Sequence, residues 1–176
     1  MNSTKKKVLL HVCCAPCAAH PIEDLINEYE VALYYSNSNI YLKKEYDKRL
    51  SFAKQIAGEY NVDLFVDAYD HQEWLKWIKG LENEPEKGKR CEKCFEFNLK
   101  RTAAFANQKK IDFFTTTLTV SPHKSSKKIF AIGETTDIFL TKDFKKKNGF
   151  KRSIELSKKF NLYRQNYCGC EFSCSP

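Results

Sequence analysis

The sequence contains no long hydrophobic run. None of its apolar stretches approaches the roughly 18 residues that a membrane-spanning helix requires, so we expect a protein that does not cross a membrane. Lys5, Lys6 and Lys7 precede a short apolar stretch in a way that resembles a secretion signal. That stretch contains His11 and ends in thiols rather than at a small-residue cleavage site. The sequence therefore predicts a cytoplasmic protein.

Internal repeats, low-complexity tracts and interdomain linkers are also missing from the 176 residues. A chain of this length can bury one substantial core, so we expect residues 1–176 to form a single domain. The hydrophobic content of 42% with 30% charged residues excludes a disordered chain. The net charge of +8 suits a polyanion such as nucleic acid, although many basic proteins bind none.

Cysteine, by contrast, is abundant and clustered. Structural disulfides are not expected for these residues in a reducing cytoplasm. Seven of the eight fall into three tight groups with CC, CxxC and CxC spacings, which favours metal binding. We expect the remaining one, Cys174, to be a bystander. The three groups consist of Cys13, Cys14 and Cys17, of Cys91 and Cys94, and of Cys168 and Cys170.

Short β-rich segments alternate with helical patterns along the chain. This alternation predicts an α/β fold with a mostly parallel, five-stranded sheet and helices on both faces. The predicted strands are residues 7–12, 31–35, 62–66, 111–117 and 137–140. Right-handed crossovers bring the carboxyl ends of all strands to one edge, where open α/β sheets bind their ligands. The segments expected at this edge are 13–17, 37–39, 67–70 and 117–124.

Cys91 and Cys94 are spaced i, i+3 at the start of a predicted helix, residues 92–108, so both sulfurs lie on one side of its first turn. The helix N-terminus and Arg90 are expected to lower the thiol pKa and favour the metal-binding thiolate. Cys168 and Cys170 form a second dithiol around a glycine. Four such thiolates suit either a closed zinc site or an iron–sulfur cluster, and the spacing does not choose between them.

The first cysteine group is not needed for such a four-ligand site. Adjacent side chains in a strand point to opposite faces, so Cys13 and Cys14 can share a metal only where the strand ends and turns. Cys14 and Cys17 could instead form a redox dithiol, or all three thiols could be small core residues. His11, inside the strand, is expected to be a hydrogen-bonded core residue.

Further polar side chains are expected near the thiol edge. Asp70 is a plausible helix cap and Asp67 a solvated loop carboxylate, or one of the two acts as a metal ligand or general acid. His123 is a candidate for phosphate or substrate contact. A basic stretch with interleaved Phe144 and Phe150 suits a solvated face, or backbone contacts and base stacking on RNA. Its cations are Lys142, Lys145, Lys146, Lys147, Lys151 and Arg152.

Five motifs in order carry a resemblance to a known family. They are LHVCCAPC at residues 10–17, RCEKCF at 90–95, SPHK at 121–124, DFKKK at 143–147 and LYRQNYCGC at 162–170. Together they resemble the QueH family, the cobalamin-independent epoxyqueuosine reductases of tRNA queuosine synthesis. The resemblance covers residues 7–173.

The resemblance implies a Rossmann-like fold of the HUP class with a cysteine-rich C-terminal tail that closes on the strand-end site. It also implies a [4Fe–4S] cluster and a second metal, iron, beside it. The reaction implied is a two-electron reduction of the epoxide on the modified wobble base of tRNA, giving queuosine and water, with electrons from a donor protein or molecule.

The resemblance also implies roles for individual residues. The family's metal-binding positions correspond to Cys13, Cys14, Cys91, Cys94, Cys168 and Cys170, and Cys17 lies in the same region. Cys91 and Cys94 are expected to hold the cluster together with tail or first-loop thiols, and the remaining thiols, with Cys17 or Asp70, to hold the single metal. Asp70 is the expected proton donor, with Asp67 or Tyr69 as alternatives. The expected RNA contacts are Lys145, Lys146, Lys147, Lys151, Arg152 and His123.

Two places depart from the pattern of this family, because Ser-Asn-Ser-Asn-Ile at residues 36–40 stands where an Asn-Pro-Asn-Ile turn is common, and Asn98 stands where an arginine often precedes leucine. A tRNA thiolation enzyme of the same fold class is an alternative, but the Ser-Gly-Gly-x-Asp-Ser phosphate loop that its chemistry requires is replaced by residues 13–17. A zinc-stabilised RNA-binding module without catalysis is the alternative from another class.

Overall fold

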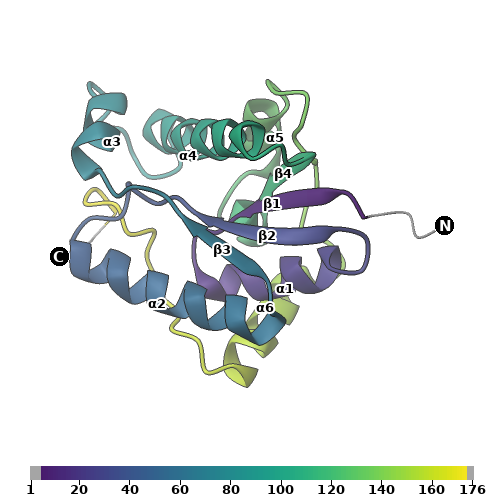
Figure 1. The fold of residues 1–176 in the computed structure, drawn as a ribbon. Helices are drawn as coiled ribbons and strands as arrows, with labels where there is room; N and C mark the ends of the chain where they lie inside the picture. Colours follow the sequence, from purple (N-terminus) through teal and green to yellow (C-terminus); the bar gives the residue numbers. More distant parts are fainter. Residues whose placement is uncertain (1–4, 174–176) are drawn as a thin grey trace.

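Four parallel strands form the centre of the computed structural model, which describes residues 5–173 (Figure 1). Cys174 therefore lies outside the described residues. The strand order is β3–β2–β1–β4, with Leu9 of β1 opposite Ala32 of β2 and Phe114 of β4. The strands are β1 Lys7–His11, β2 Glu30–Tyr35, β3 Asp63–Val66 and β4 Phe113–Thr116.

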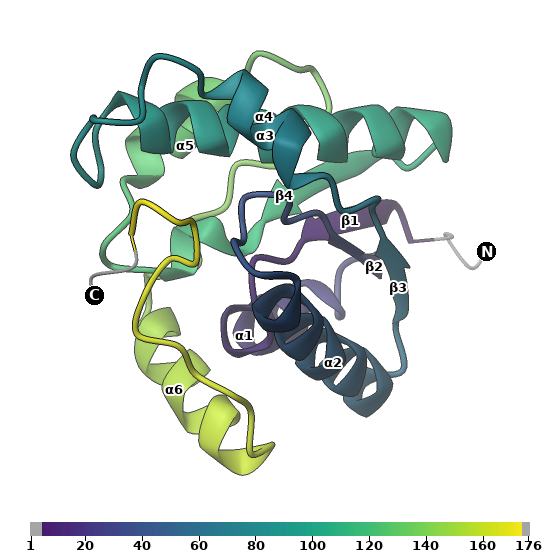
Figure 2. The ribbon, with the colours of Figure 1, turned by 90° about the vertical axis from the view of Figure 1, so that its left-hand side faces the viewer.

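Helices cover both faces of the sheet, as the alternating pattern predicted. Helices α1, α2 and α6 lie on one side, and α3, α4 and α5 lie on the other (Figure 1, Figure 2). A short 3₁₀ helix, η1, follows β4 directly. The helices are α1 Ala15–Leu25, α2 Lys43–Tyr60, α3 His71–Trp77, α4 Lys89–Gln108, η1 Thr117–Val120, α5 Ser126–Gly133 and α6 Gly149–Lys159.

The prediction of a fifth strand at residues 137–140 is wrong. This segment forms only one parallel bridge, in which Phe139 pairs with Phe114. The Phe114 amide donates to Ile138 O, and the Leu140 amide donates to Phe114 O. The chain then turns away, and Lys142 O accepts a hydrogen bond from Thr119 in η1. The pairing with β4 cannot extend into a strand, because the backbone beyond Leu140 leaves the edge of the sheet.

The central strand β1 contributes to two hydrophobic cores, one on each face of the sheet. Val8 and Leu10 pack in the larger core with residues of α1, α2 and α6. Leu9 packs in the second core with residues of α4 and α5. All three side chains are fully buried. This alternation follows from the two-residue period of a strand, and it explains why a strand covered on both faces is hydrophobic throughout.

Helix α1 begins earlier than proline placement alone suggested. Pro16 occupies the first turn, where a missing amide proton costs no helical hydrogen bond. Pro21, which is a plausible helix start on the same argument, lies inside the helix and is buried. The early start matters for the site, because it follows the cysteine-bearing turn with no intervening loop.

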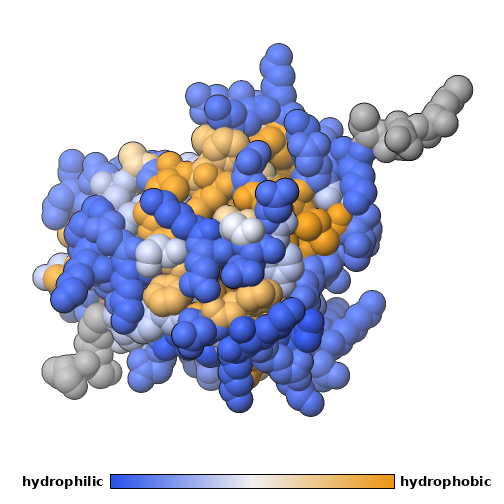
Figure 3. Space-filling view, turned by 60° about the horizontal axis from the view of Figure 1, so that its bottom comes forward, coloured by the Kyte–Doolittle hydropathy of each residue, from blue (hydrophilic) through white to orange (hydrophobic). Residues whose placement is uncertain are grey.

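Hydrophobic side chains gather in the middle of the face seen in Figure 3, and hydrophilic side chains surround them. This view looks from the side of the sheet that carries α1, α2 and α6 (Figure 1). Among the described residues, no helix combines the length and apolarity needed to span a membrane.

Candidate metal centre

The first cysteine group lies in the turn between β1 and α1. β1 ends at His11, and Cys14 forms the N-cap of α1 in an extended conformation. The Sγ atoms of Cys13, Cys14 and Cys17 all lie within 4.8 Å of one another, and those of Cys13 and Cys14 are 3.9 Å apart. The turn thus brings two adjacent cysteines and a third, three residues later, into one space.

Hydrogen bonds among these sulfurs concentrate negative charge on one of them. Cys14 accepts from the thiols of Cys13 and Cys17, which holds its pKa well below the usual range. Donation to Cys14 raises the pKa of Cys13 to about 12, and donation to Cys13 and Cys14 raises that of Cys17. Thr117 accepts from the Cys13 amide at 3.0 Å and donates to its sulfur at 3.2 Å. The group therefore carries an anionic sulfur in a buried position.

The second cysteine group combines the start of α4 with the C-terminal tail. Cys94 and Cys170 are buried in a cluster that also contains Trp74 and Phe97. A hydrogen bond from Cys170 lowers the pKa of Cys168 to about 6, although burial opposes the shift, and Lys124 adds a smaller favourable charge. The tail thiol at Cys168 is thus largely ionised at neutral pH.

The prediction that Arg90 and the helix N-terminus lower the pKa of the α4 thiols is wrong. Burial raises the pKa of both Cys91 and Cys94. The charge of Arg90 lowers the pKa of Cys91 by less than burial raises it, and the guanidinium donates to backbone carbonyls of Leu81 and Glu82 in the preceding loop. Desolvation of a thiolate outweighs one cation whose hydrogen bonds are used elsewhere.

A cavity of about 660 Å³ joins the two groups at the carboxyl edge of the sheet. Both cysteine groups contribute to its wall, through Cys13, Cys14, Cys17, Cys94 and Cys168. The rest of the lining is mostly polar and comes from the loops after β1, β2 and β4, from α2 and α4, and from residues 164–168. This is the edge at which the sequence predicted a site, and the thiols converge there.

Lys124 and Arg49 are two of the cavity-wall cations that the sequence did not single out as site residues. Lys124 is largely surrounded by protein, which would lower its pKa, but the charges of Cys168 and Cys13 outweigh burial and raise it. Arg49 lies on α2 and is only 3% exposed. Lys124 belongs to the SPHK motif, which was a usable signal. Arg49 lies in mid-helix among ordinary surface-type residues, and no local pattern marks it.

The tail closes over the cavity as expected, and contacts with several other elements hold it. Arg49 Nη1 donates to Cys168 O at 2.8 Å, and the Tyr41 amide donates to Gly169 O at 2.8 Å. His71 Nε2 lies 3.0 Å from Glu171 Oε1. Phe172 packs beside Trp74 and under the guanidinium of Arg90, 4.9 Å from its ring centroid.

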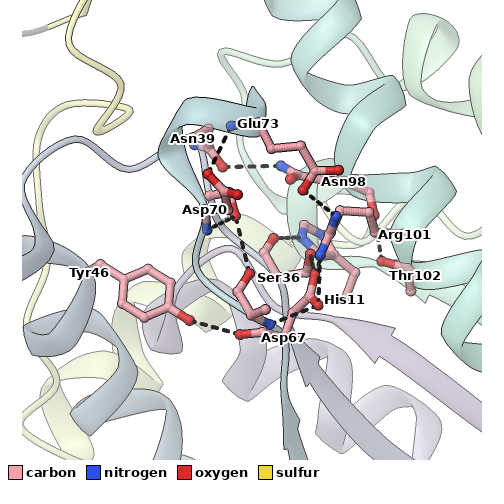
Figure 4. A network of polar contacts seen from close by, with 12 residues as sticks. His11, Ser36, Asn39, Tyr46, Asp67, Asp70, Glu73, Asn98, Arg101 and Thr102 are labelled. Atoms are coloured by element: carbon pink, nitrogen blue, oxygen red, sulfur yellow. Dashed lines mark hydrogen bonds and ion pairs between the residues drawn. The ribbon is translucent and has the colours of Figure 1, made fainter. Parts of the chain in front are cut away.

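His11 is a core residue, as predicted. Its Nδ1 lies 2.9 Å from Thr116 Oγ1 and its Nε2 lies 3.1 Å from Ser36 O. Complete burial lowers its pKa to about 4, so the ring is neutral at physiological pH. Its two hydrogen bonds join β1 to the ends of β2 and β4, below the cysteine turn (Figure 4).

The three candidate proton donors after β3 do not line the cavity. Asp67 binds Arg101 through both carboxylate oxygens, at 2.6 and 3.0 Å, and accepts from Ser36 at 2.7 Å (Figure 4). Asp70 caps α3 by accepting from the Glu73 amide at 2.9 Å. The Tyr69 hydroxyl donates to Ile40 O at 2.8 Å.

Some cations of the basic stretch bind other residues of the chain, and others project from the surface. Lys145 donates to Lys124 O at 2.9 Å and to Ser126 Oγ at 2.7 Å, so it holds the loop that carries His123 and Lys124. Arg152 pairs with Glu23 at 3.0 Å. The side chains of Lys146, Lys147 and Lys151 are exposed. Phe144 is buried in the core, whereas Phe150 and His123 line the cavity.

Asn98, one of the departures from the family pattern, contacts the turn after β2. Its Nδ2 on α4 donates to Asn39 Oδ1 at 3.2 Å, and both side chains line the cavity (Figure 4). Asn98 Oδ1 is buried without a hydrogen-bond partner among the described residues. The segment 36–40 and Asn98 are thus joined through one buried pair.

Comparison with known proteins adds an independent result. The sequence profile of the family described as "Epoxyqueuosine reductase QueH" matches residues 8–175. A relative with this description from Streptococcus pyogenes serotype M1 is 39% identical over 183 residues, which cover 98% of this chain and 72% of the relative. Another from Thermotoga maritima is 35% identical over 174 residues, covering 94% of this chain and 89% of the relative.

Among solved structures, the fold is similar to that of the U34-tRNA thiolase NcsA from Methanococcus maripaludis with its [4Fe-4S] cluster. The TM-score is 0.59 at 11% identity, covering 98% of this chain and 62% of that chain. At this identity the similarity shows a shared fold alone.

Proposed function

Because the chain belongs to the QueH family of epoxyqueuosine reductases, we propose that it reduces the epoxide of epoxyqueuosine at the tRNA wobble position to queuosine. The overall reaction consumes two electrons and two protons and releases one water molecule. The observation that carries this proposal is the convergence of two thiol groups from three distant segments on one cavity at the sheet edge.

The donor set fits an iron–sulfur cluster with a second metal beside it. Three sulfurs lie within 4.8 Å of one another, and a half-buried cation, Lys124, lines the same cavity. Trp74 Nε1 is buried without a hydrogen-bond partner among the described residues and lies in the cluster that contains Cys94 and Cys170. A buried N–H donor and a half-buried cation both suit anionic sulfur.

We assign the two groups of thiols to two metals on the basis of this grouping. Cys91, Cys94, Cys168 and Cys170 would hold the [4Fe–4S] cluster, and Cys13, Cys14 and Cys17 would hold a mononuclear iron. When bound, the cluster would supply electrons one at a time and the second metal would act as a Lewis acid on the epoxide oxygen.

The chain's own residues would bind the substrate and hold protons at the cavity wall. Lys124 would hold an ammonium proton at the cavity wall. His123 and Phe150 line the same wall and suit contacts to the phosphate and the ring of a nucleotide. Asp70, Asp67 and Tyr69 remain proposed as proton donors, although their polar atoms are engaged outside the cavity.

The partner proposed for this surface is a tRNA that carries epoxyqueuosine, and electrons would come from an external donor. The positive net charge and the exposed Lys146, Lys147 and Lys151 support an anionic partner. Cys13, Cys14, Cys17, Cys91, Cys94 and Cys168 are free thiols, which suits the reducing cytoplasm that we propose as its compartment.

An anaerobic assay tests the function directly. The purified protein is incubated with epoxyqueuosine-containing tRNA and a chemical reductant, and the nucleosides are quantified by mass spectrometry. We expect conversion to queuosine by a brown, iron-containing protein with broad visible absorption. A colourless protein that carries one zinc and leaves the nucleoside unchanged would contradict the proposal and favour the zinc-stabilised RNA-binding module.

A further inference from the structure

Arg49 makes a set of contacts that no sequence motif indicated. It lies on α2, is 3% exposed and contributes to the cavity wall. Its Nε donates to Glu45 Oε1 at 2.7 Å, and its Nη1 donates to Cys168 O at 2.8 Å. One guanidinium thus joins an internal carboxylate to the backbone of the tail dithiol.

The tail is shaped to receive this guanidinium. Gly169 has φ +112°, which side chains rarely adopt, and a Cβ there would lie 2.9 Å from Arg49 Nη2 and 3.0 Å from Nη1. The ring of Tyr167 covers the other side, 5.1 Å from the guanidinium carbon. The Tyr41 amide holds Gly169 O, so the tail between Cys168 and Cys170 is fixed from two directions.

One guanidinium nitrogen of Arg49, Nη2, takes no part in the hydrogen bonds to Glu45 and Cys168. Nη2 is buried and has no hydrogen-bond partner among the described residues. Burial would lower the pKa of Arg49, but Glu45 and, more weakly, the charge of Cys14 and the side chain of Tyr167 outweigh it, so the group stays cationic. A buried donor without a partner is rare in folded proteins, and a site that receives an anionic group explains it.

We propose that Arg49 is a positioning residue, which holds the tail dithiol in place for metal binding and donates its unpaired Nη2–H to anionic sulfur of the assembled centre. The second half of this statement rests on the proposed function. The first half depends only on the contacts of Arg49 with Cys168, Gly169 and Glu45.

Thiol alkylation of the metal-free, full-length chain tests the positioning role. Lysine keeps the charge of Arg49 but cannot reach Glu45 and Cys168 O at the same time, because it lacks the planar fork. We expect iodoacetamide to modify Cys168 at least about tenfold faster in Arg49→Lys, as for loss of one charge-assisted hydrogen bond. Lys54→Met, an exposed change on the same helix, should leave the rates unchanged.

Two further variants distinguish the loss of the Arg49 contacts from a general folding defect. Gly169→Ala disturbs the same contact from the tail side and should also accelerate alkylation. Glu45→Gln keeps an acceptor for Nε and should resemble the wild type. Equal alkylation rates in Arg49→Lys, Gly169→Ala and the wild type would overturn the positioning role.

The hydrogen bond to sulfur is tested on anaerobically reconstituted protein. Hydrogen bonds to cluster sulfur favour the reduced, more negative state, so Arg49→Lys should have a more negative midpoint potential than wild type and Lys54→Met. An unchanged potential at full iron content would overturn this part. If the wild type binds no iron and leaves epoxyqueuosine unchanged, the proposed function fails, whereas the alkylation result still decides the positioning role.

Discussion

Asp67 shows how a carboxylate at the correct edge of the sheet can serve the fold. Its two oxygens accept two hydrogen bonds from Arg101 and one from Ser36, and the Ala68 amide adds a fourth at 2.9 Å. Arg101 in turn reaches Glu73 on α3 at 2.8 Å, so the network ties α4 to the loop after β3 (Figure 4). Asp67 follows β3 at the edge of the sheet that carries the thiols, but its oxygens do not line the cavity.

The Asp67 network predicts a pH-dependent stability difference. Burial would raise the pKa of Asp67, but the hydrogen bonds from Arg101 and Ser36 outweigh it and hold the pKa below the usual range. The ionised form is therefore the stabilising one. Asp67→Asn should lower the free energy of unfolding of the metal-free chain by about 1–3 kcal/mol at neutral pH.

Because the folded pKa is depressed, this contribution is present above the unfolded pKa of about 3.9 and disappears as the pH falls through the folded value. The difference between wild type and variant should thus shrink in acid. Urea unfolding at a series of pH values measures it, with Asp63→Asn, at an exposed position, as control. A difference that stays constant with pH would contradict the assigned network.

At the scale of elements, the C-terminal tail completes the site. It contributes two thiols, covers the cavity and is held by α2 and α3. Its backbone has little regular structure, so its position depends on hydrogen bonds and packing made by other elements. We therefore expect the tail to be more sensitive to ligand loss than the sheet is.

Removal of a tail thiol should cost metal and activity together. We predict that Cys168→Ala or Cys170→Ala loses bound iron and turnover of epoxyqueuosine, because each removes one ligand of the proposed cluster. Cys174→Ala, the same change at the predicted bystander, should retain both. Iron analysis and the nucleoside assay on the same preparations measure this. Full metal content and activity in the first two variants would show that the tail is not a ligand arm.

In the loop before α6, exposed lysines can be changed to test RNA binding without disturbing the fold. We predict that Lys146→Ala with Lys147→Ala weakens tRNA binding and reduces its salt dependence, because exposed cations release counterions when they meet phosphate. A double change at Lys158 and Lys159, two exposed lysines at the end of α6, is the matched control. Equal affinities and equal salt slopes for the two double variants would argue against this loop as the interface.

For the molecule as a whole, stability comes from a sheet that is covered on both faces. The two cores meet across β1 and β2, so large side chains of these strands have no route to solvent. This arrangement provides a rigid edge from which the cysteine turn and the neighbouring loops extend.

A change at the centre of β2 should test this arrangement. Leu33 is fully buried, and Leu33→Ala removes apolar contacts and leaves a cavity, for an expected loss of roughly 2–5 kcal/mol in the free energy of unfolding. Val66→Ala, at a 45% exposed position at the end of β3, should cost much less. Denaturant unfolding of the metal-free variants measures both, and similar losses would contradict the layered core.

Local patterns in the sequence determined the fold class and the position of the thiol site. The two-residue and helical periods predicted the parallel α/β fold with helices on both faces, and the cysteine spacings predicted the thiol edge. His11 was correctly expected in the core, and Asp70 as a helix cap, because strand burial and cap chemistry depend on neighbouring residues alone. Five ordered motifs also identified the family.

Only the tertiary structure decided which long-range contacts form. The segment around Phe139 has strand-forming residues but a single bridge, since the chain is drawn away toward η1. Arg49 and Lys124 enter the cavity, and Asp67 turns to Arg101, because of how separate elements pack. Burial, and not the adjacent Arg90, sets the thiol pKa of Cys91. Desolvation and partner choice depend on the whole fold, and no local pattern encodes them.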